Sequence, residues 1–86
     1  MGFYPNDNIN EVFTLNFTFH GDNIGMMCNS NESLEEIINR LREKINLDFR
    51  NIMYIYHRKR ITNMQIPAKY FKDNNEILII DNDYIF

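Results

Sequence analysis

Three residues of the chain could support nucleophilic catalysis. Cys28 is the only cysteine, and His20 and His57 are the only histidines. A thiol becomes a strong nucleophile when a neighbouring imidazole removes its proton, so the two side chains must face each other. Cys28 falls on the apolar face of a predicted strand, whereas His20 falls on the polar face of the strand before it. We therefore expect Cys28 to be buried and structural, and we predict that the chain is not an enzyme.

Other residue patterns that hold metals or cofactors are missing from the sequence. Two histidines at distant positions do not give the spacing of a metal site, and one cysteine excludes both an internal disulfide and a multi-cysteine zinc site. No glycine-rich phosphate-binding loop is present. Glu35 and Glu36 are adjacent carboxylates, but they stand where a helix is expected to begin, and capping accounts for them. We expect no metal and no cofactor.

Four consecutive residues, His57, Arg58, Lys59 and Arg60, make the most basic segment of the chain. Such a segment can contact an acidic partner protein or phosphate groups, and it can also be a solvated turn. The whole chain has a formal net charge of −3, which opposes general binding to nucleic acids and anionic membranes. A phosphate- or nucleic-acid-binding module that uses turn 57–60 is therefore only the alternative prediction.

The elements that position these residues begin with a predicted hairpin. From Val12 onward, apolar and polar residues alternate strictly, as in a strand with one face in the core. The segment from His20 to Asn23 contains Gly, Asp and Asn, which tolerate the positive φ angles of a tight turn. In the second strand, Met27 is an apolar residue on the outer face. The inward residues of the two strands are Phe13, Leu15, Phe17, Phe19, Ile24, Met26 and Cys28.

A capping box marks the start of the main predicted helix. In Ser33-Leu34-Glu35-Glu36, the Ser33 hydroxyl and the Glu36 carboxylate can each accept a hydrogen bond from a backbone N–H group that has no helical partner. Apolar residues then recur with helical spacing up to about Lys44 to Asn46. The apolar stripe consists of Leu34, Ile37, Ile38, Leu41 and Ile45. Because the hairpin also has an apolar face, we expect the helix to pack on it.

The second half of the chain predicts two further strands joined by a long connection. Residues 52–56 are β-branched, aromatic or otherwise apolar throughout, and therefore present apolar side chains on both faces. Ile61 is expected in a brief strand, and residues 66–71 in a short helical turn. Residues 76–80 form the last strand, with Ile77 and Ile79 inward. The outward apolar residues of these two strands are expected to be Met53, Ile55, Leu78 and Ile80.

Length and element order together suggest one fold class. A chain of 86 residues with 44% hydrophobic and 24% charged residues has room for a single core. The order is hairpin, helix, strand, long connection and strand, and the long connection suggests that the last strand inserts beside the first. We predict an α+β fold in ββαββ order, in which a mixed sheet packs on one main helix, as in β-grasp proteins.

With its elements in this order, the chain resembles the ubiquitin-like family over roughly Leu15 to Asp81. The resemblance is carried by the Gly21 hairpin, the Ser33-Leu34 helix start with Ile37 and Leu41, the strand Tyr54-Ile55-Tyr56, the Lys59-Arg60-Ile61 segment and Tyr70 to Ile80. It implies a β-grasp fold, which hosts conjugated modifiers, adaptor domains and scaffold subunits. Role must therefore be argued separately from fold.

Two departures from ubiquitin refine this expectation. A conjugated modifier ends in Gly-Gly, whereas this sequence ends with Asp81 and residues 82–86, which contain no glycine. The turn after the third strand holds the basic segment 57–60 where ubiquitin has a glycine. We therefore expect a non-conjugated, non-catalytic protein-interaction domain that serves as a subunit or adaptor of a larger complex.

The resemblance also implies a contact surface. Ile55, Leu78 and Ile80 occupy positions similar to ubiquitin's hydrophobic recognition patch, with Met53 and Met27 as neighbours. Exposed apolar clusters on small proteins usually mark interaction sites. We predict that a partner protein binds there and that Arg58, Lys59 and Arg60 contribute charge. The alternative is that Phe3-Tyr4 or Tyr84-Ile85-Phe86 of the same chain covers this face.

The expected organisation is one domain with two short extensions. Residues 1–10 form a flexible N-terminal arm, residues 11–81 the ubiquitin-like domain, and residues 82–86 a C-terminal tail. No signal peptide or membrane-spanning run is present, and a single cysteine suits a reducing compartment. We expect an intracellular protein, cytoplasmic or nuclear, with no membrane attachment, no nucleic-acid partner and no disulfide-linked oligomer.

Overall fold

The first hairpin follows directly from the alternating pattern. Strands β1 (Val12–Phe19) and β2 (Asp22–Asn29) pair antiparallel over their full length. Two residues join them, His20 with φ 51° and Gly21 with φ 85°. Positive φ at both positions belongs to the mirror-image turn that matches the twist of a hairpin, and glycine adopts it without steric cost.

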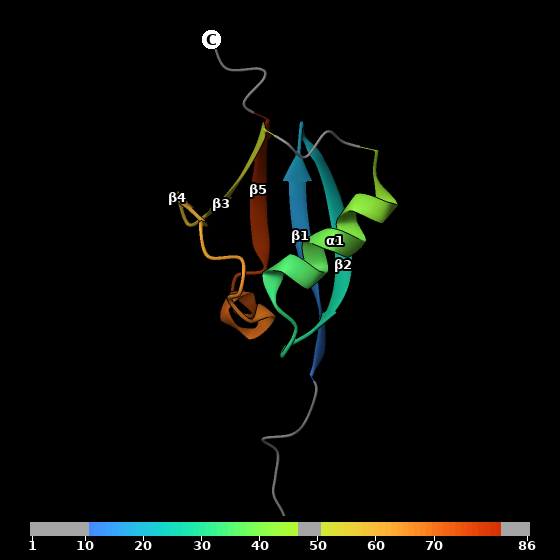
Figure 1. Ribbon diagram of the computed structural model, residues 1–86, viewed down its shortest axis with the longest axis vertical. Helices are drawn as coiled ribbons and strands as arrows, with labels where there is room; N and C mark the ends of the chain where they lie inside the picture. Colours follow the sequence, from blue (N-terminus) through green and yellow to red (C-terminus); the bar gives the residue numbers. More distant parts are fainter. Residues whose placement is uncertain (1–10, 47–50, 82–86) are drawn as a thin grey trace, which may run out of the picture.

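The computed structural model describes residues 11–46 and 51–81 of the chain (Figure 1). The predicted N-terminal arm, residues 1–10, and the predicted tail, residues 82–86, lie outside the described residues, as does the suggested covering of the sheet by Phe3-Tyr4 or Tyr84-Ile85-Phe86.

Helix α1 (Leu34–Lys44) begins at the predicted capping box. The backbone N–H of Glu36 donates to Ser33 Oγ at 3.2 Å, and the backbone N–H of Ser33 donates to Glu36 Oε1 at 3.0 Å. The helix buries Leu34, Ile37, Ile38 and Leu41, and it ends with Ile45 as its C-cap. Two backbone donors that lack helical partners are thus satisfied locally, and the apolar stripe packs on the sheet.

The sheet has five strands in the order β2-β1-β5-β3-β4. Strand β3 (Ile52–Tyr56) forms a hairpin with β4 (Lys59–Arg60), and β5 (Glu76–Asp81) lies between β3 and β1. β5 runs parallel to β1 and antiparallel to β3, so the last strand does insert beside the first, as predicted. Helix α1 crosses one face of this sheet (Figure 1). The predicted α+β, ββαββ arrangement is confirmed.

The long connection between β4 and β5 contains a 3₁₀ helix (Ala68–Phe71), at the place where a short helical turn was expected. The brief strand lies at Lys59–Arg60 instead of Ile61, which is buried in the core. The cause is the tight turn before it: Tyr56 pairs with Lys59, so pairing starts two residues earlier.

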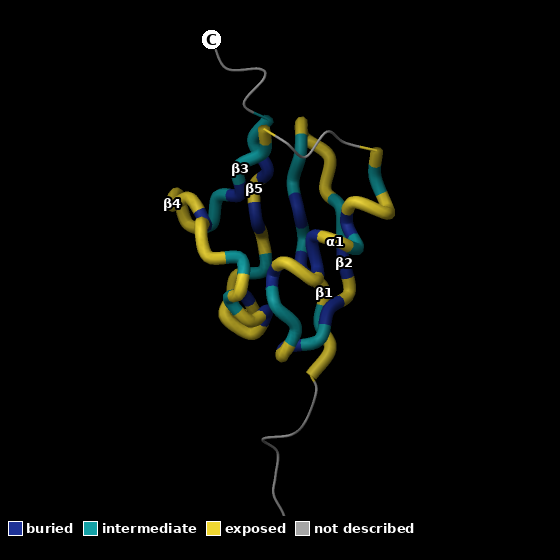
Figure 2. Tube along the Cα trace, viewed as in Figure 1, coloured by how far each residue is buried: buried dark blue, intermediate teal, exposed yellow. Residues whose placement is uncertain are grey.

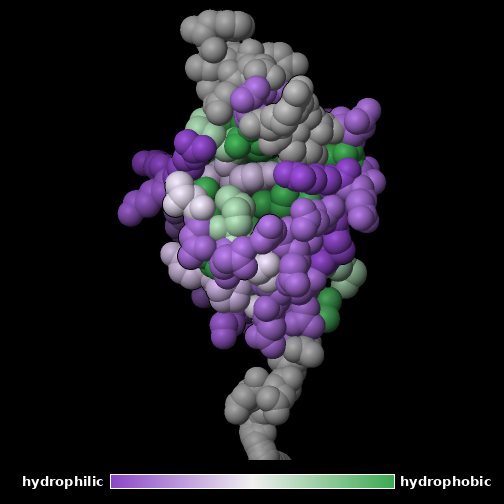
Figure 3. Space-filling view, viewed as in Figure 1, coloured by the Kyte–Doolittle hydropathy of each residue, from purple (hydrophilic) through white to green (hydrophobic). Residues whose placement is uncertain are grey.

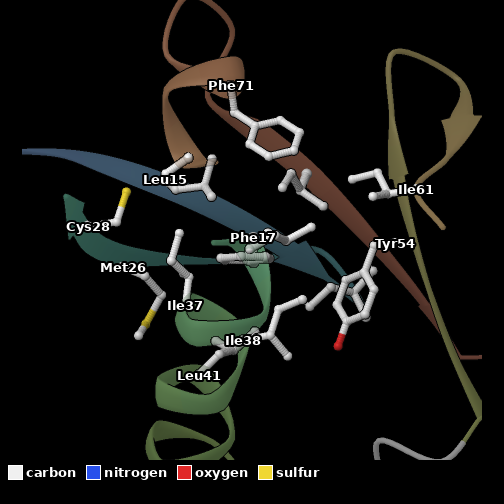
Figure 4. Close-up of a cluster of buried hydrophobic side chains, with 14 residues drawn as sticks. Leu15, Phe17, Met26, Cys28, Ile37, Ile38, Leu41, Tyr54, Ile61 and Phe71 are labelled. Carbon is white, nitrogen blue, oxygen red and sulfur yellow. The ribbon is translucent and has the colours of Figure 1, made fainter. Parts of the chain in front are cut away.

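One hydrophobic core lies between the sheet and α1, and the buried stretches of Figure 2 follow β1, β5 and the helix. Phe17 has no exposed surface and lies between Phe71 and the helix residues in Figure 4. Cys28 is 3% exposed, and burial raises the pKa of its thiol. Burial likewise raises the pKa of Tyr54 to about 12. Both groups therefore stay protonated at neutral pH.

Candidate functional site

The sheet face opposite α1 carries a cluster of apolar side chains from two neighbouring strands. Met53 pairs with Ile80, and Ile55 pairs with Leu78, in the antiparallel register of β3 and β5. Side chains directly opposite each other lie on the same face with Cβ atoms about 5 Å apart. Leu78 is 43% exposed, and the other three are half-buried. These four residues are called the apolar patch below.

Met27 lies on the same face but apart from the apolar patch. It is 65% exposed on β2, where it pairs with Thr14 of β1. Strand β1 stands between β2 and β5, and its outward residues in this region are polar: Thr14, Asn16 and Thr18. An exposed apolar residue near Met27 on this face is Val12, which sequence reasoning missed although it opens the alternating strand. Met27 and the apolar patch share an outward direction, and only the position of β1 between β2 and β5 separates them. The prediction from sequence grouped them because it used direction alone.

A hollow of about 430 Å³ borders the apolar patch and is called the outer hollow. Ile55 and Leu78 form its apolar side, and His57 and Arg58 add the first two residues of the basic segment. Thr18, Asn74, Glu76 and Ile77 complete its lining. The outer hollow therefore joins apolar, basic and acidic groups, which is the composition of a protein contact with a polar rim.

His57 is held in place from two sides. Its ring stacks on Tyr56, with centroids 4.3 Å apart, and its Nε2 atom lies 2.6 Å from the Asn74 side-chain nitrogen. Asn74 belongs to the turn that precedes β5, so this hydrogen bond ties the β3–β4 turn to the start of β5. Sequence reasoning did not anticipate this contact, because it joins two separate turns.

The β3–β4 turn is conformationally strained. Its two residues, His57 and Arg58, have φ angles of 52° and 68°. L-residues pay a steric cost in this left-handed region, and hairpins of this type commonly use Asn-Gly or Gly-Gly. In this strained conformation Arg58 lines the outer hollow. A glycine at position 58 would relieve the strain but would bring no positive charge to the hollow.

The Arg58→Gly variant is expected to raise the free energy of unfolding by about 1 kcal/mol, because glycine adopts φ 68° without a Cβ clash. Lys59→Gly is the matched control. Lys59 is a strand residue without positive φ, so its replacement should lower the free energy of unfolding by about 0.5–1 kcal/mol. Urea denaturation monitored by circular dichroism measures both. Equal destabilisation by the two variants would contradict the strain.

The remaining basic residues line a different hollow. Lys59 and Arg60 border a depression of about 560 Å³ whose floor is aromatic, called the aromatic hollow below. His57 lines both hollows. The basic segment 57–60, which the sequence analysis treated as one group, is therefore divided between two surfaces, because the tight turn directs successive side chains to different sides.

No protein-family model and no curated protein matches the chain. Among solved structures, the ubiquitin-like domain of the Arabidopsis thaliana protein At2g32350 superposes with a TM-score of 0.66 at 7% identity, covering 93% of this chain and 86% of that one. The chain has a ubiquitin-like fold. The N-terminal ubiquitin-like domain of the 4931431F19Rik protein agrees, with a TM-score of 0.64, 8% identity and coverage of 94% and 85%.

In this ubiquitin-like fold, helix side chains cover the free edge of β2. Arg40 Nη2 donates to the Met27 carbonyl oxygen at 2.8 Å, and Lys44 Nζ donates to the Gly25 carbonyl oxygen at 3.0 Å. Glu32 accepts from the Asn29 N–H and pairs with both terminal nitrogens of Arg40. The hydrogen bond from Arg40 lowers the pKa of the Glu32 carboxyl. An edge with occupied backbone groups is a poor site for an added strand.

Cys28 faces the core at 3% exposure, and no group of three or more His, Cys, Asp or Glu side chains could hold a metal ion within residues 11–46 and 51–81. Over the same residues, no helix has the length and apolar character needed to cross a membrane. On the helix side, polar residues cover most of the described surface (Figure 3).

Proposed function

We propose that residues 11–81 form a non-catalytic protein-interaction domain, acting as a subunit or adaptor of a larger complex and binding its partner through the outer sheet face. The observation that carries this proposal is the apolar patch: four apolar side chains, paired across β3 and β5, on the sheet face opposite the helix. Ubiquitin-like domains are generally protein-interaction modules, which agrees with this role.

The energetics favour burial of this patch against another protein. Exposed apolar area contributes roughly 25 cal/mol per Å² when it leaves water, and Leu78 alone is 43% exposed. A stable interface covers about 800 Å² per partner, which is more than four side chains provide. The outer hollow adds to the contact area, and its residues His57, Arg58 and Glu76 can form a polar rim around the apolar centre.

The proposal includes an intracellular location, cytoplasmic or nuclear, which the single cysteine supports. Of the two remaining basic residues, Arg60 pairs with Ile55 at the edge of the apolar patch, whereas Lys59 pairs with Tyr56 and has no place in the apolar contact. The competing proposal is a phosphate- or nucleic-acid-binding module built on turn 57–60, and the two differ in their response to salt.

Capture of the partner from cells of the source organism, followed by salt titration of the purified complex, separates the two proposals. An interface centred on the apolar patch should keep its dissociation constant within about threefold between 50 and 500 mM NaCl. Binding through about three phosphate contacts should weaken by about 100-fold or more over the same range. A steep salt dependence, with a nucleic acid or phosphoprotein as the captured molecule, would replace the first proposal by the second.

A further inference from the structure

The aromatic hollow is a second concave surface, and it does not include the apolar patch. It opens between the β3–β4 turn and the connection that leads to the 3₁₀ helix Ala68–Phe71. Its volume of about 560 Å³ is in the range of ligand-binding pockets on proteins. The lining residues that matter below are Tyr56, Tyr70 and Phe71 on the floor and His57, Lys59 and Arg60 on the rim.

The floor is an aromatic cluster with one face open. Tyr56 and Phe71 meet edge to face at 4.8 Å between centroids, and Tyr70 lies 5.3 Å from Phe71 and 6.0 Å from Tyr56. Phe71 is fully buried, whereas Tyr70 is 64% exposed. A large aromatic ring held in a cluster but open to water is available to a further apolar or aromatic side chain.

The rim is positively charged in a chain that is acidic as a whole. Lys59, Arg60 and His57 line the hollow, and its lining contains no Asp or Glu. The full sequence has 12 acidic and 9 basic residues, so this segregation of charge is local. Two acidic residues lie nearby: burial raises the pKa of Tyr56 and the charge of Asp73 contributes to this rise, and Glu76 lines the outer hollow. Neither carboxylate lies in the lining.

We propose that the aromatic hollow binds an acidic peptide segment of a protein partner, with a bulky apolar side chain seated on the aromatic floor. Carboxylates of the peptide on either side of that anchor contact Lys59 and Arg60. The apolar floor selects a side chain of the size of Phe or Leu, and the cationic rim selects the flanking acids.

Phosphate fits this surface less well than carboxylates. Phosphate sites use clustered backbone N–H groups, glycine-rich loops or a helix N-terminus, and the lining of the aromatic hollow contains no glycine. Two Lys or Arg side chains and one histidine in a chain of net charge −3 give a small attraction for a nucleic-acid backbone. The aromatic floor supplies the additional contact that a peptide side chain requires.

A short fluorescein-labelled peptide, with two acidic residues on each side of one phenylalanine, tests the proposal by fluorescence anisotropy with the full chain. Saturable binding is expected, with at least tenfold weakening in Lys59→Glu, Arg60→Glu and Tyr70→Ala. Lys69→Glu is the matched control: it makes the same change in net charge outside the lining and should stay within about threefold of the wild type. Thermal unfolding by circular dichroism verifies that each variant folds.

Two changes in the probe make the result specific. Replacing its acids by their amides, or its phenylalanine by glycine, should each weaken binding at least tenfold. Backbone amide shifts in NMR spectra should change at Tyr56, Ile61 and Tyr70. The proposal is overturned if no saturable binding occurs up to about 1 mM peptide, if the amide-substituted peptide binds equally well, if the shifts concentrate at Thr18 and Leu78, or if inorganic phosphate or a short oligouridylate binds more tightly.

The result is separate from the outcome for the apolar patch. Lys59 and Tyr70 line the aromatic hollow and belong to neither the apolar patch nor the outer hollow, so loss of peptide binding in their variants and loss of a partner at the outer sheet face can occur independently. Two positions are shared: His57 lines both hollows, and Arg60 lines the aromatic hollow and pairs with Ile55 of the apolar patch.

Discussion

The Ile55→Asp variant is expected to lose the captured partner, with a dissociation constant raised at least 100-fold. Ile55 lies in the apolar patch, where it pairs with Leu78 on β5 and with Arg60 on β4. A carboxylate at this position would replace an apolar contact at the centre of the interface, and the loss of its hydration on binding costs several kcal/mol. Isothermal titration calorimetry with the purified partner measures the change.

The fold should survive this replacement, because Ile55 is half-buried on the outer face and does not belong to the core between sheet and helix. Asn39→Asp is the matched control. It adds the same charge at an exposed position of α1, on the opposite side of the sheet, and should leave the partner's affinity unchanged. Unfolding of Ile55→Asp, or unchanged binding by the folded variant, would remove Ile55 from the contact.

Phe17→Ala is expected to lower the free energy of unfolding by about 3–5 kcal/mol. Phe17 has no exposed surface, and alanine would leave a cavity between Phe71 and the helix residues (Figure 4). A domain of this length has a total stability of roughly 4–13 kcal/mol, so the variant should be marginal or unfolded at 37 °C. Urea denaturation at 25 °C measures the loss.

Phe19→Ala provides the comparison on the same strand and the same face. Phe19 is only half-buried and stacks on His20 with ring centroids 3.9 Å apart. Its replacement should cost about 1–2 kcal/mol, since water already reaches part of the ring. Equal losses in the two variants would show that the core is not centred on Phe17.

The fold follows from periodicities that are local in the sequence. Alternation in β1 and β2 places apolar side chains on one face of the sheet. The capping box at Ser33 satisfies backbone groups at the helix end, and the apolar stripe follows it. The long connection before β5 provides enough chain to cross the sheet. These requirements act within a few residues of each other, so a single sequence suffices to identify them. The pairing of Ile55 with Leu78 then depends only on register.

The shape of the candidate surfaces depends on contacts that periodicity does not encode. Met27 shares its outward direction with Leu78, and only the position of β1 in the sheet shows that the two are apart. The division of the basic segment depends on the positive φ angle of Arg58. Sequence patterns predict positive φ mainly at glycine, so they do not indicate it at an arginine. The aromatic hollow needs Tyr56 and Tyr70, distant in sequence, to meet across the long connection.

The two side chains that donate hydrogen bonds to the free edge of β2 both come from one element, helix α1. Arg40 and Lys44 both belong to α1, so the groups that occupy the β2 carbonyl oxygens move with the helix. A molecule whose helix detaches would expose its core and an eight-residue strand edge in the same event. Since a free strand edge can pair with a second chain, we expect aggregation of this domain to begin with detachment of α1 and not to require complete unfolding.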